Sequence, residues 1–234
     1  MRERQVIRES YMTGRQKVLG GLVTAFYLLV FPFSALWLQL RIPFWQALPP
    51  AETMVLRYCA LALLLLVLFW SFFRRDLRTL LARLPDTLVH ILTGAALWAV
   101  LDLLVRCIPL PVSDPNEETY LAEYLFAPGA TLLILLLLMP LVEELVFRGF
   151  LFGTLREKSR PLAYLVTASG YALYCVWQFA FAYGAVDLRY LSLALRYLPA
   201  GLLLGWCYEK SGSVWAALLL HTAINGLTLL RILS

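Results

Sequence analysis

Charged residues are scarce in this sequence, and their scarcity excludes the class of soluble globular domains. Only 15% of the 234 residues are Asp, Glu, Lys or Arg, whereas 61% are hydrophobic. Soluble domains contain about 25% charged residues. Together with a mean hydropathy of +0.75, the composition predicts an integral membrane protein that has the lipid bilayer as a partner.

Cysteine and histidine are also few, which limits disulfide and metal chemistry. No two of the four cysteines form a CxxC pair, so the sequence indicates neither a disulfide framework nor a cysteine-based metal site. There are only two histidines, His90 and His221. The net charge of +5 is typical of a multi-span protein with basic cytoplasmic loops, and we predict no nucleic-acid partner.

Internal repeats and low-complexity linkers are missing, so we predict a single membrane domain, residues 1–234. A span needs about 20 apolar residues, and the apolar runs predict an all-α bundle of about seven transmembrane helices. The expected spans are 18–40, 53–73, 87–107, 129–155, 162–184, 190–208 and 213–231. The long polar connection, residues 109–128, is expected to be a solvated acidic loop, with a short amphipathic helix as the alternative.

The distribution of charge predicts which side of the membrane each end occupies. Cytoplasmic loops carry an excess of Lys and Arg. If the N-terminus is cytoplasmic, most of the basic residues fall on that side: Arg2, Arg4, Arg8, Arg15, Lys17, Arg74, Arg75, Arg78, Arg83, Arg156, Lys158, Arg160 and Lys210. The opposite side receives Asp114, Glu117, Glu118 and Glu123, so we predict a cytoplasmic N-terminus.

Against this apolar background, one cluster of charges is conspicuous. The segment EELVFR, residues 143–148, lies inside the predicted span 129–155. Each charge at the centre of a membrane helix costs roughly 2.5 to 3.5 kcal/mol, so such residues indicate function by default. Glu144 and Arg148 are four residues apart and face each other on a helix. Glu143 points about 100° away from Glu144 around the helix and can therefore contact a different neighbour. Pro140, three residues earlier, is expected to bend the helix beside Glu143.

The last predicted span contributes a second polar pair. In HTAIN, His221 and Asn225 are again four residues apart and on one helix face. Both can donate hydrogen bonds to a developing oxyanion. A structural ion pair and a charge relay in a transporter are alternatives for the EELVFR charges, and an acid–base site is the interpretation we favour.

EExxxR on one span and HxxxN on a later one resemble the CPBP family, the glutamic intramembrane proteases that include the type II CAAX prenyl endopeptidases. Bacterial members are also called Abi, or bacteriocin self-immunity, proteins. The resemblance covers roughly residues 129–231, which we expect to be the catalytic core, and it includes the continuation FRGFLFGTL. The first three spans carry no diagnostic residues.

The resemblance implies a role for each motif residue. Glu143 would be the general base that activates water, Glu144 and Arg148 an orienting pair, and His221 with Asn225 the oxyanion donors. No cofactor is required by this scheme. Some descriptions of the family propose a bound metal, and a divalent metal on Glu143, Glu144 and His221 stays open as the alternative.

One position departs from the family pattern. The family has an FxxxH motif between the two matched motifs, and here the segment reads YCVWQ, with Gln178 in place of the histidine. Glutamine can hold a water molecule but cannot transfer a proton. Three accounts follow: Glu143 suffices while Gln178 positions water, His90 reaches the site from the third span, or proteolysis has been lost.

We therefore predict an intramembrane endopeptidase that attacks a membrane-associated peptide or protein substrate with Glu143-activated water. Its activity is expected to be slowed by Gln178. The alternative function is a non-proteolytic membrane scaffold or bacteriocin-immunity protein with the same fold. The expected location is the plasma membrane of a bacterium, with several spans.

Overall fold

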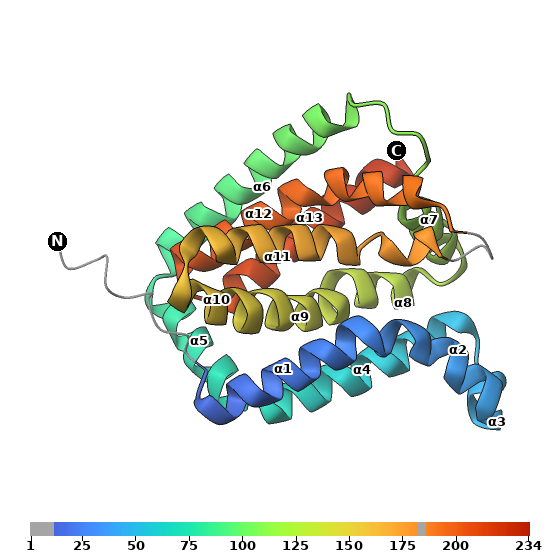
Figure 1. Ribbon diagram of the computed structural model, residues 1–234, viewed down its shortest axis with the longest axis horizontal. Coiled ribbons are helices and arrows are strands. Elements are labelled where there is room, and N and C mark those ends of the chain that lie inside the picture. The colour runs from blue at the N-terminus through green and yellow to red at the C-terminus, as the bar shows by residue number, and fades with distance from the viewer. Residues whose placement is uncertain (1–11, 182–185) are drawn as a thin grey trace.

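The computed structural model describes residues 12–181 and 186–234, and every regular element in these ranges is a helix (Figure 1). The predicted all-α fold is thereby confirmed. The basic residues Arg2, Arg4 and Arg8, which entered the prediction of a cytoplasmic N-terminus, lie outside the described residues. The α-helices are α1 (Gly14–Leu29), α2 (Phe31–Arg41), α3 (Pro43–Gln46), α4 (Pro50–Leu68), α5 (Trp70–Ala82), α6 (Leu84–Arg106), α7 (Pro115–Phe126), α8 (Pro128–Leu133), α9 (Met139–Glu144), α10 (Gly153–Lys158), α11 (Arg160–Tyr174), α12 (Ala194–Ser211) and α13 (Val214–Leu233).

Within residues 12–181 and 186–234, four helical stretches are long and apolar enough to cross a membrane. They are α4, α6, the continuous stretch Pro128–Lys158 and α13. The bent pair α1 and α2 adds a fifth candidate if it counts as one span. The protein is thus a multi-pass membrane protein, but the predicted number of seven spans is not confirmed, and α11 is only 15 residues long.

The first predicted span, residues 18–40, is a broken helix. The axes of α1 and α2 meet at 63°. Pro32 lies in the first turn of α2 and has no N–H to donate to the preceding turn, so the hydrogen-bond ladder of α1 cannot continue through it. α1 packs beside the stretch that holds the EELVFR charges.

The two ends of the bundle differ in charge. Figure 1 shows the start of α1, helix α5 and the α10–α11 turn at one end, with α3, α7 and the C-terminus at the other. We call the first the basic end, because it carries the described cations Arg15, Lys17, Arg74, Arg75, Arg78, Arg83, Arg156, Lys158, Arg160 and Lys210. The other we call the acidic end, because it carries Asp114, Glu117, Glu118 and Glu123.

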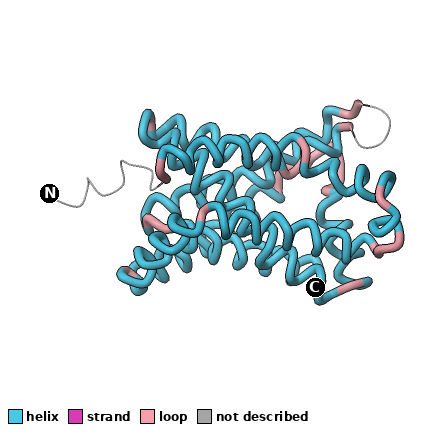
Figure 2. Tube along the Cα trace, turned by 90° about the horizontal axis from the view of Figure 1, so that it is seen from below, coloured by secondary structure: helices cyan, strands magenta, loops and turns pink. Residues whose placement is uncertain are grey.

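α12 packs against both α11 and α13, and the short connection of Gly212 and Ser213 joins α12 to α13. Figure 2 shows the bundle from a second direction, with helices making up nearly all of the described chain. α12 ends at Gly212, whose φ of 68° is left-handed and favours glycine. At Gly201 the backbones of α12 and α11 come so close that an added Cβ would lie 2.9 Å from the carbonyl oxygen of Ala168. Gly201 therefore lets α11 and α12 pack closely.

Candidate active site

The Pro128–Lys158 stretch is irregular on both sides of the two glutamates. π-helical turns cover Ile134–Leu138 and Leu145–Phe152, and α9 with Glu143 and Glu144 lies between them. π-turns widen a helix and leave backbone groups without regular partners. The irregularity expected at Pro140 thus takes the form of a π-helical turn that ends two residues before it.

The carbonyls released around Pro140 are satisfied by the HTAIN segment of α13. Pro140 has no N–H for the carbonyl of Leu136, and the Thr222 hydroxyl donates to that oxygen at 2.6 Å. The side-chain amide of Asn225 donates to the carbonyl oxygen of Leu135 at 2.8 Å. The same segment that carries His221 is therefore docked against the helix that carries the glutamates.

Glu144 is held between a guanidinium and an imidazole. Its Oε1 accepts from Arg148 Nη1 at 2.8 Å and lies 2.7 Å from His221 Nδ1. Arg148 is fully buried, donates from Nη2 to the carbonyl oxygen of Gly201 at 3.2 Å, and stacks 4.8 Å from the ring centroid of Tyr171. The facing of Glu144 and Arg148 follows the helical spacing used to predict it.

The contact with Glu144 fixes the orientation of the histidine. A carboxylate can only accept hydrogen bonds, so His221 Nδ1 carries a proton and donates a hydrogen bond to Glu144. The other ring nitrogen, Nε2, then faces Tyr171 Oη at 3.2 Å and Glu143 Oε2 at 3.7 Å. His221 is thus oriented by one glutamate and directed towards the other.

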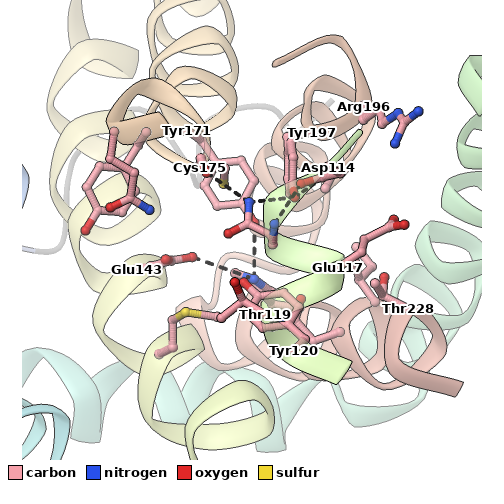
Figure 3. A pocket seen from close by; sticks show the side chains of 18 of the residues that line it. Asp114, Glu117, Thr119, Tyr120, Glu143, Tyr171, Cys175, Arg196, Tyr197 and Thr228 are labelled. Atoms are coloured by element: carbon pink, nitrogen blue, oxygen red, sulfur yellow. Dashed lines mark hydrogen bonds and ion pairs between the residues drawn. The ribbon is translucent and has the colours of Figure 1, made fainter. Parts of the chain in front are cut away.

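Glu143 borders a cavity and receives a hydrogen bond from the N-terminal part of the chain. Its Oε1 accepts from the Tyr27 hydroxyl of α1 at 3.1 Å, and Tyr27 has no exposed surface. The cavity has a volume of about 290 Å³ and extends from Glu143 towards α7 at the acidic end (Figure 3). His221, Asn225 and Gln178 line the same cavity.

Helix α7 lines the acidic end of this cavity, which corrects the expectation of a solvated loop over residues 109–128. Glu117 accepts from Arg106 at 2.7 Å and from Arg231 at 2.9 Å. Burial opposes ionisation of Glu117, but the hydrogen bonds from the two arginines outweigh it, and the pKa of this carboxyl is lowered. Asp114 accepts from Tyr197 at 2.9 Å, and burial raises the pKa of Asp114 despite that bond. The alternative prediction of a short helix is the correct one.

His90 does not reach this cavity, so the account in which it replaces the missing histidine is wrong. It lies near the start of α6 and lines a different cavity at the basic end. The α6 residues that line the site cavity begin further along the helix. Trp98 and Asp102 are among them, and they lie two and three helical turns beyond His90. Gln178, on the 3₁₀ turn Trp177–Ala180, is left without a second histidine beside it.

The site includes two tyrosines that the motifs did not predict, Tyr27 and Tyr171. Tyr27 belongs to the first three predicted spans, where no diagnostic residue was recognised. A tyrosine in an apolar helix is ordinary, and only its contact with Glu143 marks it. Tyr171 lies one helical turn before the YCVWQ segment. Its position in the sequence does not reveal its contact with His221.

The described residues do not favour a metal centre. Within residues 12–181 and 186–234, no three His, Cys, Asp or Glu side chains are grouped to hold a metal ion. Glu144 Oε1 is occupied by Arg148 and His221, which removes the oxygen nearest the imidazole from the candidate ligands. The residues present therefore fit an acid–base site better than the metal alternative.

Comparison with known proteins agrees with the resemblance seen in the motifs. Residues 125–227 match the family model described as type II CAAX prenyl endopeptidase Rce1-like. This model describes a group within the CPBP family, which the motifs were found to resemble. The match contains both EELVFR and HTAIN and begins within α7. No curated protein and no solved structure matches the chain.

Proposed function

We propose that this protein is an intramembrane endopeptidase in which Glu143 activates a water molecule for attack on a peptide carbonyl. The observation that carries the proposal is the chain of contacts Arg148–Glu144–His221, which directs His221 Nε2 towards Glu143. The family match over residues 125–227 supports a hydrolase of the CAAX endopeptidase kind. Glu143 would take a proton from water as the oxygen attacks the carbonyl carbon.

The later steps return that proton. The tetrahedral intermediate carries a negative oxygen, and His221 would donate a hydrogen bond to it from Nε2 with both ring nitrogens protonated and Nδ1 held by Glu144. Glu143 would then protonate the leaving amine as the carbon–nitrogen bond breaks. Asn225 would serve as a second donor, although its amide contacts the carbonyl of Leu135 at the same time.

Gln178 would hold the attacking water rather than move protons. It lines the cavity with Glu143 and carries an amide that both donates and accepts. Loss of a general acid–base group typically reduces the rate by about 10² to 10⁴. We therefore expect slow turnover, on membrane-associated peptide or protein substrates.

A second function is favoured by the same residue. A non-proteolytic scaffold or immunity protein with this fold needs no proton transfer, so it would tolerate Gln178 in place of the expected histidine. The preserved contacts among Glu143, Glu144, Arg148 and His221 argue against it, because a scaffold has no chemical need for them.

The two functions are separated by purified protein tested on a panel of membrane-associated peptides. Wild type, Glu143→Ala, Gln178→His and the exposed control Glu118→Gln are compared. Cleavage by wild type and by Glu118→Gln, with none by Glu143→Ala, supports the protease. No cleavage by wild type and a gain with Gln178→His supports the scaffold. A plasma-membrane location in a bacterium stays a prediction of the sequence.

A further inference from the structure

A second cavity lies at the basic end of the molecule, on the side away from Glu143. It has a volume of about 190 Å³ and is formed where α6 begins and α12 ends. Its lining is polar apart from Val89. The polar members are Arg83, Asp86, Thr87, His90, Lys210 and Ser211.

Two buried polar atoms of this lining lack a hydrogen-bond partner among the described residues. Thr87 is only 1% exposed, and its Oγ1 has no hydrogen-bond partner. The buried Nδ1 of His90 has no hydrogen-bond partner either. A helical threonine can donate to the carbonyl four residues earlier, as Thr131 and Thr167 do in this protein, but Thr87 does not. A buried polar atom without a partner costs about 1–3 kcal/mol, so two of them beside one cavity point to a ligand.

The charges around the cavity indicate an anionic group. The side chains of Arg83 and Lys210 are exposed at its rim, and neither forms an ion pair within the described part of the chain. No side chain caps the start of α6, and unpaired N–H groups at a helix N-terminus attract phosphate. The carbonyl of Tyr208 near the end of α12 already accepts from Gly212, which reduces its repulsion of an anion.

We propose that this cavity binds a phosphate group, either of a phospholipid headgroup or of free phosphate. Arg83 and Lys210 would pair with the phosphate oxygens, and the Thr87 hydroxyl would donate to one of them. Basic pockets between membrane helices on the cytoplasmic side are suited to lipid headgroups. Asp86 opposes an anion, and its carboxylate would accept a hydrogen bond from the ammonium of an ethanolamine headgroup.

The test uses the full chain, delipidated in detergent. The thermal unfolding midpoint is measured, and bound ligand is detected separately by native mass spectrometry. Three ligands are added separately: inorganic phosphate, phosphatidylethanolamine and phosphatidylglycerol. Binding of inorganic phosphate alone identifies a free-phosphate site, and binding of either lipid identifies a headgroup site. Asp86→Asn should weaken phosphatidylethanolamine and strengthen phosphatidylglycerol if the ammonium contacts this carboxylate.

Substitutions decide whether the cavity is the site. Arg83→Gln and Lys210→Gln should each weaken binding about tenfold or more, as expected for a lost charge-assisted hydrogen bond. Thr87→Val should weaken binding while leaving the ligand-free midpoint unchanged or higher, because it removes an unpaired hydroxyl. Arg78→Gln removes one charge at the same end outside the cavity and should bind as wild type. Binding of none of the three ligands, or equal weakening by Arg78→Gln, would overturn the proposal.

Discussion

Glu144 makes its contacts with Arg148 and His221 at a place where none of the three side chains is more than 1% exposed. Removing one partner of a buried ion pair leaves an uncompensated charge, which destabilises a protein by about 3–5 kcal/mol. The pair is therefore a structural requirement as well as a means of orienting His221.

Glu144→Gln should lower both folded yield and activity. The neutral amide leaves the Arg148 guanidinium without its anion and holds the N–H of His221 Nδ1 less strongly, so the ring is no longer fixed with Nε2 towards Glu143. Thermal unfolding in detergent measures the first effect, and peptide cleavage measures the second. Glu118→Gln, an exposed change of the same chemistry, is the control. An unchanged unfolding midpoint for Glu144→Gln would mean that the ion pair is not needed for stability.

Tyr27→Phe should reduce kcat with little effect on KM, and it should also lower the unfolding midpoint because the lost hydrogen bond is buried. The substitution removes only the hydroxyl that donates to Glu143 Oε1 at 3.1 Å, so the general base loses a group that positions it. A hydrogen bond to a charged group contributes about 1.5–3 kcal/mol, which sets the scale of the loss at roughly tenfold or more. Tyr124→Phe on α7 serves as the matched control. Equal kcat values for the two variants would assign Tyr27 to packing alone.

The motif residues of the candidate site could be predicted because their types are rare in apolar helices. Glu143, Glu144 and Arg148 stand out by charge, and spacing of four placed Glu144 on Arg148. The contact between Glu144 and His221, 77 positions apart, could not be predicted from spacing, since it depends on how α13 packs. The same applies to Tyr27, which is 116 positions from Glu143.

At the scale of elements, the junction of α13 with the Pro128–Lys158 stretch depends on a missing backbone donor. Thr222→Val should destabilise the fold by about 1–3 kcal/mol, because the carbonyl of Leu136 is left unsatisfied. Pro140→Ala restores an N–H near that carbonyl, so the double variant should be more stable than Thr222→Val alone. A double-mutant cycle of unfolding free energies measures the coupling. Strictly additive effects would show that Thr222 does not compensate for Pro140.

Asp76 on α5 ties that helix to the start of α13 outside the membrane spans. It is fully buried, and its carboxylate accepts from the backbone N–H of Val214. Burial raises the pKa of Asp76 from 3.8 to about 7, with the Val214 hydrogen bond opposing the shift. The folded state therefore retains a proton that the unfolded state releases between these two pH values.

The sign of the pH dependence follows from that difference. The contribution of Asp76 to stability is present at low pH and is lost as pH rises from about 4 to about 7. Asp76→Asn keeps an oxygen for Val214 and should flatten this part of the stability curve. Unfolding midpoints measured across the window test it, with Asp86→Asn, an exposed carboxyl, as control. An unchanged slope in Asp76→Asn would assign the pH dependence to other groups.

Elements were predicted well where apolar runs were long and poorly where polar and apolar residues mix. The helices around residues 50–68, 84–106 and 214–233 correspond to predicted spans. α7 was expected as a loop, because its acidic residues suggested solvent. The partners of Glu117, Arg106 and Arg231, lie on α6 and α13, and a local sequence pattern cannot reveal them. The break between α1 and α2 was signalled by Pro32, which the span prediction passed over.

For the whole molecule, charge and cavity together indicate the direction of substrate entry. The site cavity extends from Glu143 towards the acidic end, and the cations at the opposite end favour the cytoplasm. We infer that the cavity is reached from the non-cytoplasmic side, so substrates would present their cleaved bond there. This direction follows from the predicted cytoplasmic N-terminus.

Cysteine labelling tests the orientation directly. In a variant whose four natural cysteines are replaced by alanine, Glu118→Cys on α7 and Lys158→Cys at the end of α10 place one exposed thiol at each end. With a membrane-impermeant maleimide, Glu118→Cys should react in intact cells and Lys158→Cys only after permeabilisation. Because α7 lines the acidic end of the cavity, the side from which Glu118→Cys is labelled would also be the side of entry. The reverse labelling pattern would place the opening in the cytoplasm and direct the search for substrates to cytoplasmic peptides.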